Sequence, residues 1–372
     1  MRILIYAPAA RMGGARAHLV GLVPELAAIA PEDEVLLLAQ PDLLADLPDL
    51  PPGWELRVER AHTRGFLGRL AWEQRTLPRI AERWRADVLL SFGSFVPLQS
   101  ACPTVLEAGN ALHFTHAYWH ALRSESARMQ IEEYARWALL RASLRAAERI
   151  LAPTRAMRQD VVMRLPELAD RIDVALWGVA SVFHSRRWTP PLGTTVLGVS
   201  KHGINKEFDV LIEALWHLPP NVQLRLTGTQ EESRWSRRSA SLVARLGLQE
   251  RVCFVGDVPN PRVPDLIGEA RLLVFPTWCE SFGLPLAEAL AMGAPAIAGD
   301  IPACREVGGE AACYYRPGDA QALAEAIGSL LNDPARSEGL AQAAFERGQK
   351  FRWRDNAVAV RATLERAVSG RG

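Results

Sequence analysis

The chain of 372 residues is longer than one typical hydrophobic core and suits two domains. Its 43 basic and 42 acidic residues leave a formal net charge of +1, so we expect no nucleic-acid arm and no nucleic-acid partner. The five cysteines lack a Cys-x-x-Cys pair and predict free thiols in a reducing cytoplasm, and no apolar run reaches membrane-spanning length.

The first half of the chain alternates short apolar runs with helical patterns. Residues 2–6 predict a buried parallel strand, followed by a loop with Gly13 and Gly14 and a helix over about 15–28. Such a glycine-containing loop can hold an anion at the helix N-terminus, although a plain tight turn explains the two glycines equally well. Further strands are predicted at 34–38, 56–59, 88–91 and 104–106, and the last strand of this half, with its turn, at 149–154.

Residues 66–85 have helical periodicity and many arginines. They predict a solvated amphipathic helix, with contact to an acceptor or a membrane surface as the alternative.

Histidines and aromatic residues follow the strand at 104–106 and precede a long predicted helix ending near residue 148. The spacing of His113, His116 and His120 would suit a metal on one helical face, but no carboxylate or cysteine completes a site, so we expect none. The alternatives are ordinary surface histidines or contact with a substrate at the carboxyl edge of the sheet. Asn110 and His113 are the candidates for that contact.

The second half repeats the alternation after a linker at 186–194. Strands alternating with helices predict a parallel sheet covered on both faces, hence an α/β fold. The predicted strands lie at 196–199, 221–226, 252–255, 272–275, 296–298 and 313–315, and the helices between them at 206–217, 235–246, 262–269, 285–292 and 319–332.

Lysine is scarce in this chain, which has 40 arginines and three lysines. Two of the three, Lys201 and Lys206, lie in one loop after the strand at 196–199. A compact ammonium suits a crowded diphosphate better than a planar guanidinium does, although chance placement is the alternative. We therefore expect Lys201 and Lys206 to bind phosphate.

The stretch 274–290 runs from the end of a strand through a short loop into a helix closed by Gly293. Gly283 lets the backbone approach a ligand, and free N–H groups at a helix N-terminus form an anion site. The loop also brings Glu280 and Glu288, whose carboxylates accept hydrogen bonds from hydroxyls such as those of a sugar and a ribose. The expected N–H donors are Phe282, Gly283, Leu284 and Leu286.

Glu280-x7-Glu288 within ESFGLPLAEALAMGAP resembles the signature of retaining family-4 glycosyltransferases. The resemblance implies the GT-B fold, with two Rossmann-like doubly wound domains facing a central cleft. Residues 1–178, completed by the C-terminal helix 353–372, would form the acceptor-binding domain. Residues 179–352 would bind the nucleotide sugar.

The resemblance also implies residue roles. Glu280 would contact the transferred sugar and Glu288 the ribose, with Lys206 and Lys201 on the donor phosphates. At the Lys201 position the family has Arg, and where Glu207 stands Gly is usual. Trp177 occupies a position that is commonly Asn, and the sequence indicates no role for it. The remaining expected donor-binding residues are Gly13, Gly14, Val258, Phe282, Gly283 and Leu284.

The implied activity is retaining transfer of a hexose from a UDP- or GDP-linked sugar to a glycan, lipid-linked or small-molecule acceptor, as in polysaccharide biosynthesis. The chain has no Asp-x-Asp, so we expect no metal and no cofactor besides the nucleotide sugar. The alternatives are an epimerase or phosphorylase on the same fold, or a non-catalytic nucleotide-sugar-binding protein. We expect a cytoplasmic protein, with peripheral contact of the N-terminal domain to the inner face of the membrane as an option; the oligomeric state stays open.

Overall fold

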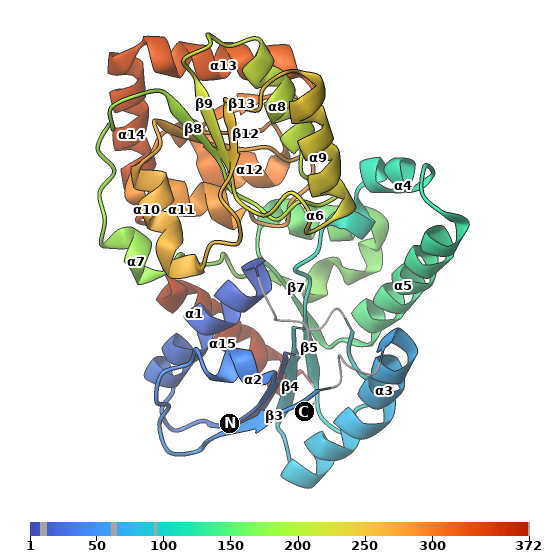
Figure 1. Ribbon diagram of the computed structural model, residues 1–372. Helices are drawn as coiled ribbons and strands as arrows, with labels where there is room; N and C mark the ends of the chain where they lie inside the picture. The colour runs from blue at the N-terminus through green and yellow to red at the C-terminus, as the bar shows by residue number, and fades with distance from the viewer. Residues whose placement is uncertain (8–12, 61–64, 93–94, 371–372) are drawn as a thin grey trace. The chain divides into compact units, whose positions relative to one another are not determined.

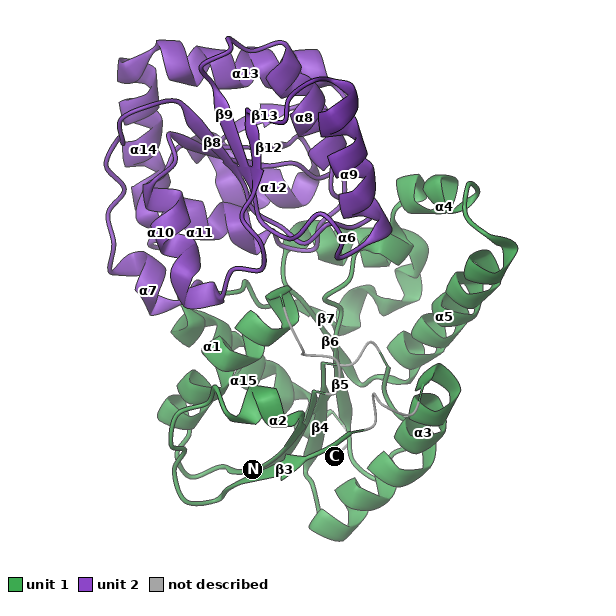
Figure 2. Ribbon diagram, in the orientation of Figure 1, with its two compact units in different colours: residues 1–178, 352–372 green, residues 179–351 purple. Residues whose placement is uncertain are grey.

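The computed structural model describes residues 1–7, 13–60, 65–92 and 95–370. The chain forms two compact units (Figure 2), of which the first comprises Met1–Gly178 with Arg352–Gly372 and the second comprises Val179–Phe351. Arg352 thus belongs to the first unit, whereas the sequence placed it in the second domain. No helix among the described residues is long and apolar enough to cross a membrane.

The first unit is built on a parallel seven-stranded sheet with the order β3-β2-β1-β4-β5-β6-β7 (Figure 1). Its central strands are nearly continuous apolar runs because helices cover both faces of a parallel sheet. The strands are β1 (Arg2–Ala7), β2 (Glu34–Ala39), β3 (Trp54–Val58), β4 (Val88–Ser91), β5 (Thr104–Glu107), β6 (Arg149–Ala152) and β7 (Ile172–Val174).

The C-terminal helix α15 (Trp353–Ser369) returns to the first unit and shares its core with α1 (Gly13–Ile29). The other helices of this unit are α2 (Pro41–Leu44), α3 (Gly65–Trp84), η2 (Leu112–Phe114), α4 (His116–Leu122), α5 (Ala127–Ala146), α6 (Arg155–Arg164) and η3 (Pro166–Arg171).

The long helix predicted to end near residue 148 is observed as α5, and the histidine segment before it forms the 3₁₀ turn η2 and the separate helix α4. The break has a local cause, because the Ser126 side chain accepts a hydrogen bond from the Met129 N–H (3.3 Å) and so starts α5 anew.

The second unit has a parallel six-stranded sheet in the order β10-β9-β8-β11-β12-β13, the doubly wound order of dinucleotide-binding folds. The strands are β8 (Thr195–Gly198), β9 (Gln223–Leu226), β10 (Val252–Phe254), β11 (Leu272–Phe275), β12 (Ala296–Gly299) and β13 (Cys313–Tyr315). The helices are α7 (Ser181–His184), α8 (Phe208–Trp216), α9 (Arg234–Arg245), η4 (Asn260–Arg262), α10 (Val263–Gly268), α11 (Leu284–Met292), α12 (Pro302–Gly308), η5 (Gly309–Ala311), α13 (Ala320–Asn332) and α14 (Pro334–Gly348).

The helix α14 was not predicted from the sequence. It starts at Asp333, whose carboxylate accepts a hydrogen bond from the Arg336 N–H (3.0 Å), and it ends on α11. A Cβ on Gly348 would lie 2.3 Å from the Ala291 nitrogen, so only glycine allows this close approach of the two helices.

The strand order places the predicted site residues of the second unit at its topological switch point. Strands are added on opposite sides of β8 and β11, which lie next to each other in the sheet. The loop after β8 carries Lys201 and Lys206, and the loop after β11 carries Glu280. Ligands of doubly wound sheets bind at the carboxyl ends of the strands at this switch point.

Candidate active site

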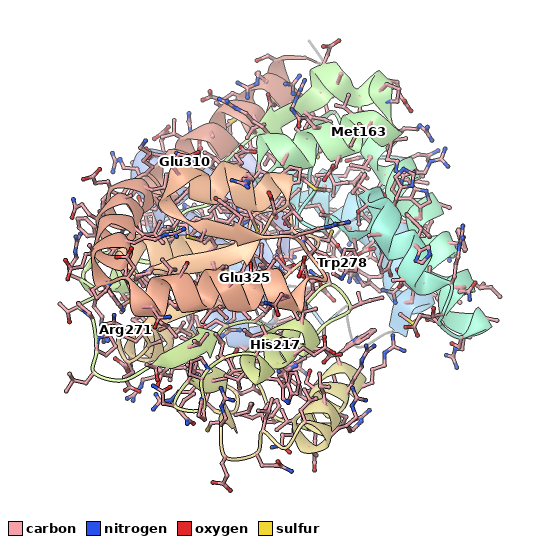
Figure 3. All side chains as sticks on the ribbon, turned by 90° about the horizontal axis from the view of Figure 1, so that it is seen from above. Met163, His217, Arg271, Trp278, Glu310 and Glu325 are labelled. Carbon is pink, nitrogen blue, oxygen red and sulfur yellow. The ribbon has the colours of Figure 1, made fainter. Side chains whose placement is uncertain are left out.

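The loops after β8 and β11 are joined through their backbones. Lys206 and Thr277 form an antiparallel bridge, and the Glu207 N–H donates to the Pro276 carbonyl (2.9 Å). Trp278, labelled in Figure 3, donates its backbone N–H to the carbonyl of Asn205 (3.2 Å). The position of Lys206 relative to the β11 loop is therefore set by main-chain hydrogen bonds.

Lys206 and Glu280 form an ion pair at this junction. The Lys206 ammonium also lies 4.4 Å from the centroid of the Phe275 ring, a cation–π contact at the end of β11. The two charged side chains are 12% and 15% exposed, so both are mostly removed from water. An ammonium has three donors, so Lys206 can keep this pair and still bind a second anion.

The Glu280 carboxylate has two neutral donors besides Lys206. The Thr277 hydroxyl donates to Glu280 Oε1 (3.1 Å), and Asn205 Nδ2 lies 3.3 Å from the same oxygen. Asn205 also donates to the Cys279 carbonyl (2.7 Å). Within the described part of the chain, Glu280 Oε2 accepts no hydrogen bond, so this oxygen is available to a ligand.

Helix α11 begins at Gly283, whose φ of +97° lies in the left-handed region that favours glycine. The N–H groups of Gly283 and Leu284 have no acceptor among the described residues. The expectation for Leu286 was wrong, because its N–H donates to the Gly283 carbonyl (3.1 Å) and closes the first turn. Phe282 is fully buried and packs edge-on against Phe351 (5.7 Å between ring centroids).

Glu288 lies one turn into α11 and is 6% exposed. Burial raises its pKa to about 7, because desolvation disfavours the charged form. No other described residue donates a hydrogen bond to its carboxylate. A buried carboxylate without donors costs stability, and ligand hydroxyls would remove that cost.

Lys201 and Val258 lie in two loops of the second unit. Lys201 is exposed in the loop after β8, and Val258 is half-buried in the loop between β10 and η4.

Glu207 stands immediately before α8, where the resembled family has Gly. Its Oε2 accepts a hydrogen bond from the Tyr315 hydroxyl (2.6 Å), and burial raises its pKa. The Tyr315 hydroxyl on β13 thus holds the Glu207 carboxylate.

The candidates in the first unit lie on separate loops. Gly13 opens α1 with φ +63°, and Gly14 follows it; residues 8–12 of the same loop lie outside the described residues. Asn110 accepts a hydrogen bond from the Leu112 N–H (3.0 Å). His113 in η2 is buried, with its Nε2 2.9 Å from Glu133 Oε2. Asn110 and His113 both line a cavity of about 300 Å³ in this unit.

The three histidines of this region do not share a helical face. His113 is in η2, whereas His116 and His120 are exposed on α4. In the ranges that the structure describes, no group of three His, Cys, Asp or Glu residues is placed to hold a metal ion.

Trp177 has a role that the sequence did not indicate. Its Nε1 donates to Glu107 Oε1 (3.0 Å), and His18 Nδ1 lies 2.7 Å from the same oxygen. His18 Nε2 is 3.1 Å from Asn356 Oδ1 on α15. Trp177 thus fixes Glu107, another residue of the cavity wall, to the core of the first unit.

Two family models match the chain. The model described as Glycosyltransferase Family 4 matches residues 12–180, and the one described as Glycosyl transferases group 1 matches residues 193–333. The two matches follow each other along the chain, one mainly in each unit.

Curated proteins similar to the chain include two transferases. A D-inositol 3-phosphate glycosyltransferase of Xylanimonas cellulosilytica is 28% identical over 247 residues, which are 61% of this chain and 58% of that protein. The O-antigen chain mannosyltransferase B of Escherichia coli is 24% identical over 261 residues, 68% of this chain and 64% of that one. The chain thus spans about six tenths of the length of these relatives.

A solved structure of similar fold is Anabaena HepE in complex with UDP-glucose. It superposes with a TM-score of 0.75 at 20% identity, covering 98% of this chain and 99% of that one. The α/β class and the two-sheet GT-B architecture inferred from the sequence are confirmed.

Proposed function

Because this chain belongs to the family-4 glycosyltransferases of the GT-B fold, we propose that it transfers a hexose from a nucleoside-diphosphate sugar to an acceptor hydroxyl. The observation that carries the proposal is the cluster at the switch point of the second unit. There the Lys206–Glu280 pair lies just before α11, which carries Glu288, a buried acid without a hydrogen-bond donor among the described residues. The UDP-glucose complex of HepE supports a nucleotide-sugar donor.

In this proposal the second unit binds the donor. The N–H groups of Gly283 and Leu284 and the ammonium groups of Lys206 and Lys201 hold the diphosphate. Glu288 accepts hydrogen bonds from the ribose hydroxyls, which supply the donors that its buried carboxylate lacks. Val258 borders the nucleotide in this proposal.

Glu280 holds the transferred hexose through its open oxygen, Oε2. The bond between the anomeric carbon and the diphosphate breaks, the acceptor hydroxyl oxygen forms a new bond to that carbon with retained configuration, and the hydroxyl proton passes to the departing diphosphate. Negative charge develops on the departing diphosphate, and each well-placed donor stabilises that charge by ~3–4 kcal/mol. Proton NMR of the product tests the stereochemistry, and an inverted anomeric configuration would contradict the retaining assignment.

The donor and the acceptor class can be identified together. UDP-glucose, UDP-galactose and GDP-mannose are incubated with the protein, and release of nucleoside diphosphate is followed with and without an acceptor. A rise in the melting temperature of the protein with UDP but not with GDP, or the reverse, identifies the base of the donor. If no nucleotide sugar is consumed while nucleoside diphosphate still binds, the non-catalytic alternative replaces the transferase.

Removal of divalent metal should leave the transfer rate unchanged. The proposed diphosphate site uses ammonium groups and backbone N–H groups. These groups stabilise the negative charge of the diphosphate, as Mg²⁺ does in metal-dependent enzymes. The measurement is turnover after dialysis against EDTA. Loss of activity that Mn²⁺ or Mg²⁺ restores would rule out metal-free transfer.

Asn205→Ala should lower kcat about fivefold with little change in the KM of the donor. The variant loses one hydrogen bond to Glu280 and one to the Cys279 carbonyl, worth about 1 kcal/mol in positioning. Asn221→Ala, an exposed asparagine of the same unit, is the matched control for a general loss of stability. Equal kcat in the two variants would show that Asn205 does not position Glu280.

A further inference from the structure

The outermost strand of the seven-stranded sheet, β3, has an open edge. It pairs with β2 on one side, and no other described strand lies on its other side (Figure 1). Four of its five residues are exposed, and they include the apolar side chains of Leu56 (39%) and Val58 (47%). An open strand edge presents backbone donors and acceptors with which another chain can pair.

The hydrogen bonds at the two ends of β3 show which of its backbone groups face the open edge. At one end the Glu59 N–H donates to the Ala39 carbonyl of β2 (2.8 Å), and at the other the Gly53 carbonyl accepts from a β2 N–H (2.9 Å). The odd-numbered residues of this segment therefore face β2, because successive residues of a strand direct their backbone groups to opposite sides. The N–H and C=O groups of Leu56 and Val58 point to the open edge, and no described residue outside the sheet is bonded to them.

The sequence of β3 is complementary to itself when two copies run antiparallel. If Leu56 of one copy pairs with Leu56 of the other, Glu55 lies opposite Arg57 on both sides of that pair. The two Leu56 residues then exchange backbone hydrogen bonds, and the Val58 N–H reaches the Trp54 carbonyl of the other copy. The Glu55 and Arg57 side chains are half exposed and lie on one face of the strand, where they form an ion pair (2.7 Å). Opposite charges directly across two strands stabilise the pairing.

The apolar side chains of β3 favour the same arrangement. Trp54, Leu56 and Val58 share one face of the strand, and Trp54 packs against the core of the first unit. In the antiparallel pair, Leu56 faces Leu56 and Val58 faces Trp54, so water is removed from the exposed apolar residues. A parallel pair in register would instead place Glu55 against Glu55 and Arg57 against Arg57, and like charges directly opposite each other destabilise a sheet.

We propose that two copies of this chain associate through β3 into a twofold-symmetric dimer, in which their seven-stranded sheets form one continuous sheet. The interface is isologous, because the same five residues form both of its halves, and a twofold axis closes the assembly at two chains. An interface built on so short a strand is small, so we expect a dimer that dissociates on dilution. The dimer does not rest on the proposed transferase function, since all of these residues lie in the first unit.

Sedimentation velocity of the full chain over a series of concentrations tests the dimer. We expect the mass of one chain at low concentration and that of two chains at high concentration. Hydrogen exchange of the peptide that spans β3, followed by mass spectrometry, should slow at high concentration because the N–H groups of Leu56 and Val58 become hydrogen-bonded. A chain that stays monomeric at every concentration, or a dimer without this protection, would overturn the proposal.

Two charge reversals separate this interface from any other. Glu55→Arg sets arginines opposite each other, and Arg57→Glu sets glutamates opposite each other. Each variant should therefore raise the dissociation constant of the dimer about tenfold or more. Glu82→Arg reverses an exposed charge on α3 of the same unit and is the matched control, for which we expect the dissociation constant of the wild type.

Restoring the complementarity distinguishes a lost interface from a damaged fold. The double variant Glu55→Arg/Arg57→Glu exchanges the two charges and should dimerise as the wild type does. An equimolar mixture of the two single variants should form a heterodimer, because each arginine then faces a glutamate of the other chain. A dissociation constant that neither single reversal changes, or a dimer that neither the double variant nor the mixture restores, contradicts pairing through β3.

Discussion

Lys206→Ala is expected to lower kcat by about a hundredfold to a thousandfold while the protein remains folded. Lys206 supplies the cation that would face the leaving diphosphate, and one such group is worth ~3–4 kcal/mol in the transition state. The variant also leaves the Glu280 carboxylate without its ion-pair partner beside the transferred sugar. Initial rates with saturating nucleotide sugar measure the effect.

Two variants control this result. Lys350→Ala removes an exposed lysine after α14 and should have no effect on turnover. Lys201→Arg should retain activity, because the family that the chain resembles has Arg at this position. Near-full activity of Lys206→Ala would show that the diphosphate binds elsewhere.

Glu288→Gln should weaken nucleoside-diphosphate binding by about tenfold or more. The neutral amide replaces a carboxylate that would accept two ribose hydroxyls, a loss of roughly 1–3 kcal/mol. Calorimetric titration with UDP and GDP measures the change. Glu280→Ala is the matched comparison, because Glu280 would contact the sugar and not the ribose. Its kcat should fall while the free diphosphate still binds, and equal loss of diphosphate binding in the two variants would refute the separate roles.

The raised pKa of Glu288 adds a pH dependence with a defined sign. The pKa of an unfolded Glu is about 4.5 and that of folded Glu288 about 7, so folding favours the protonated form. The stability of the ligand-free second unit is therefore full below pH 4.5, falls between pH 4.5 and 7, and is lower by about 3 kcal/mol above pH 7. Urea unfolding of wild type and Glu288→Gln at pH 5 and 8 measures this fall, which the glutamine variant should lack.

The ribose hydroxyls donate to the ionised carboxylate, so nucleotide binding should strengthen as the pH rises through about 7. The phosphate groups of the nucleotide also change protonation with pH. Because Glu288→Gln lacks the carboxylate, the pH dependence of its nucleotide binding measures the phosphate contribution alone. An identical pH profile for wild type and variant would show that Glu288 does not contact the nucleotide.

The strands could be predicted because buried parallel strands are short apolar runs, and all twelve predicted runs overlap observed strands, whereas the three-residue strand β7 was not predicted. Helix boundaries followed local signals such as the Gly293 cap of α11. Helix α14 was missed because its alanine-rich pattern is weak and its close packing on α11 depends on Gly348. The break before α5 depends on one serine cap.

The sequence by itself determined the two α/β halves, the family and the loop that carries Glu280 and Glu288, because these features lie in local periodicity and one continuous motif. Only the tertiary structure decided which groups meet. Lys206 and Glu280 are 74 residues apart, and Glu73 and Tyr6 are 67 apart. Periodicity shows which face of an element is buried but not what it packs against, since that choice depends on strand order and long-range packing. For the same reason, the raised pKa of Glu288 appears only in the folded chain.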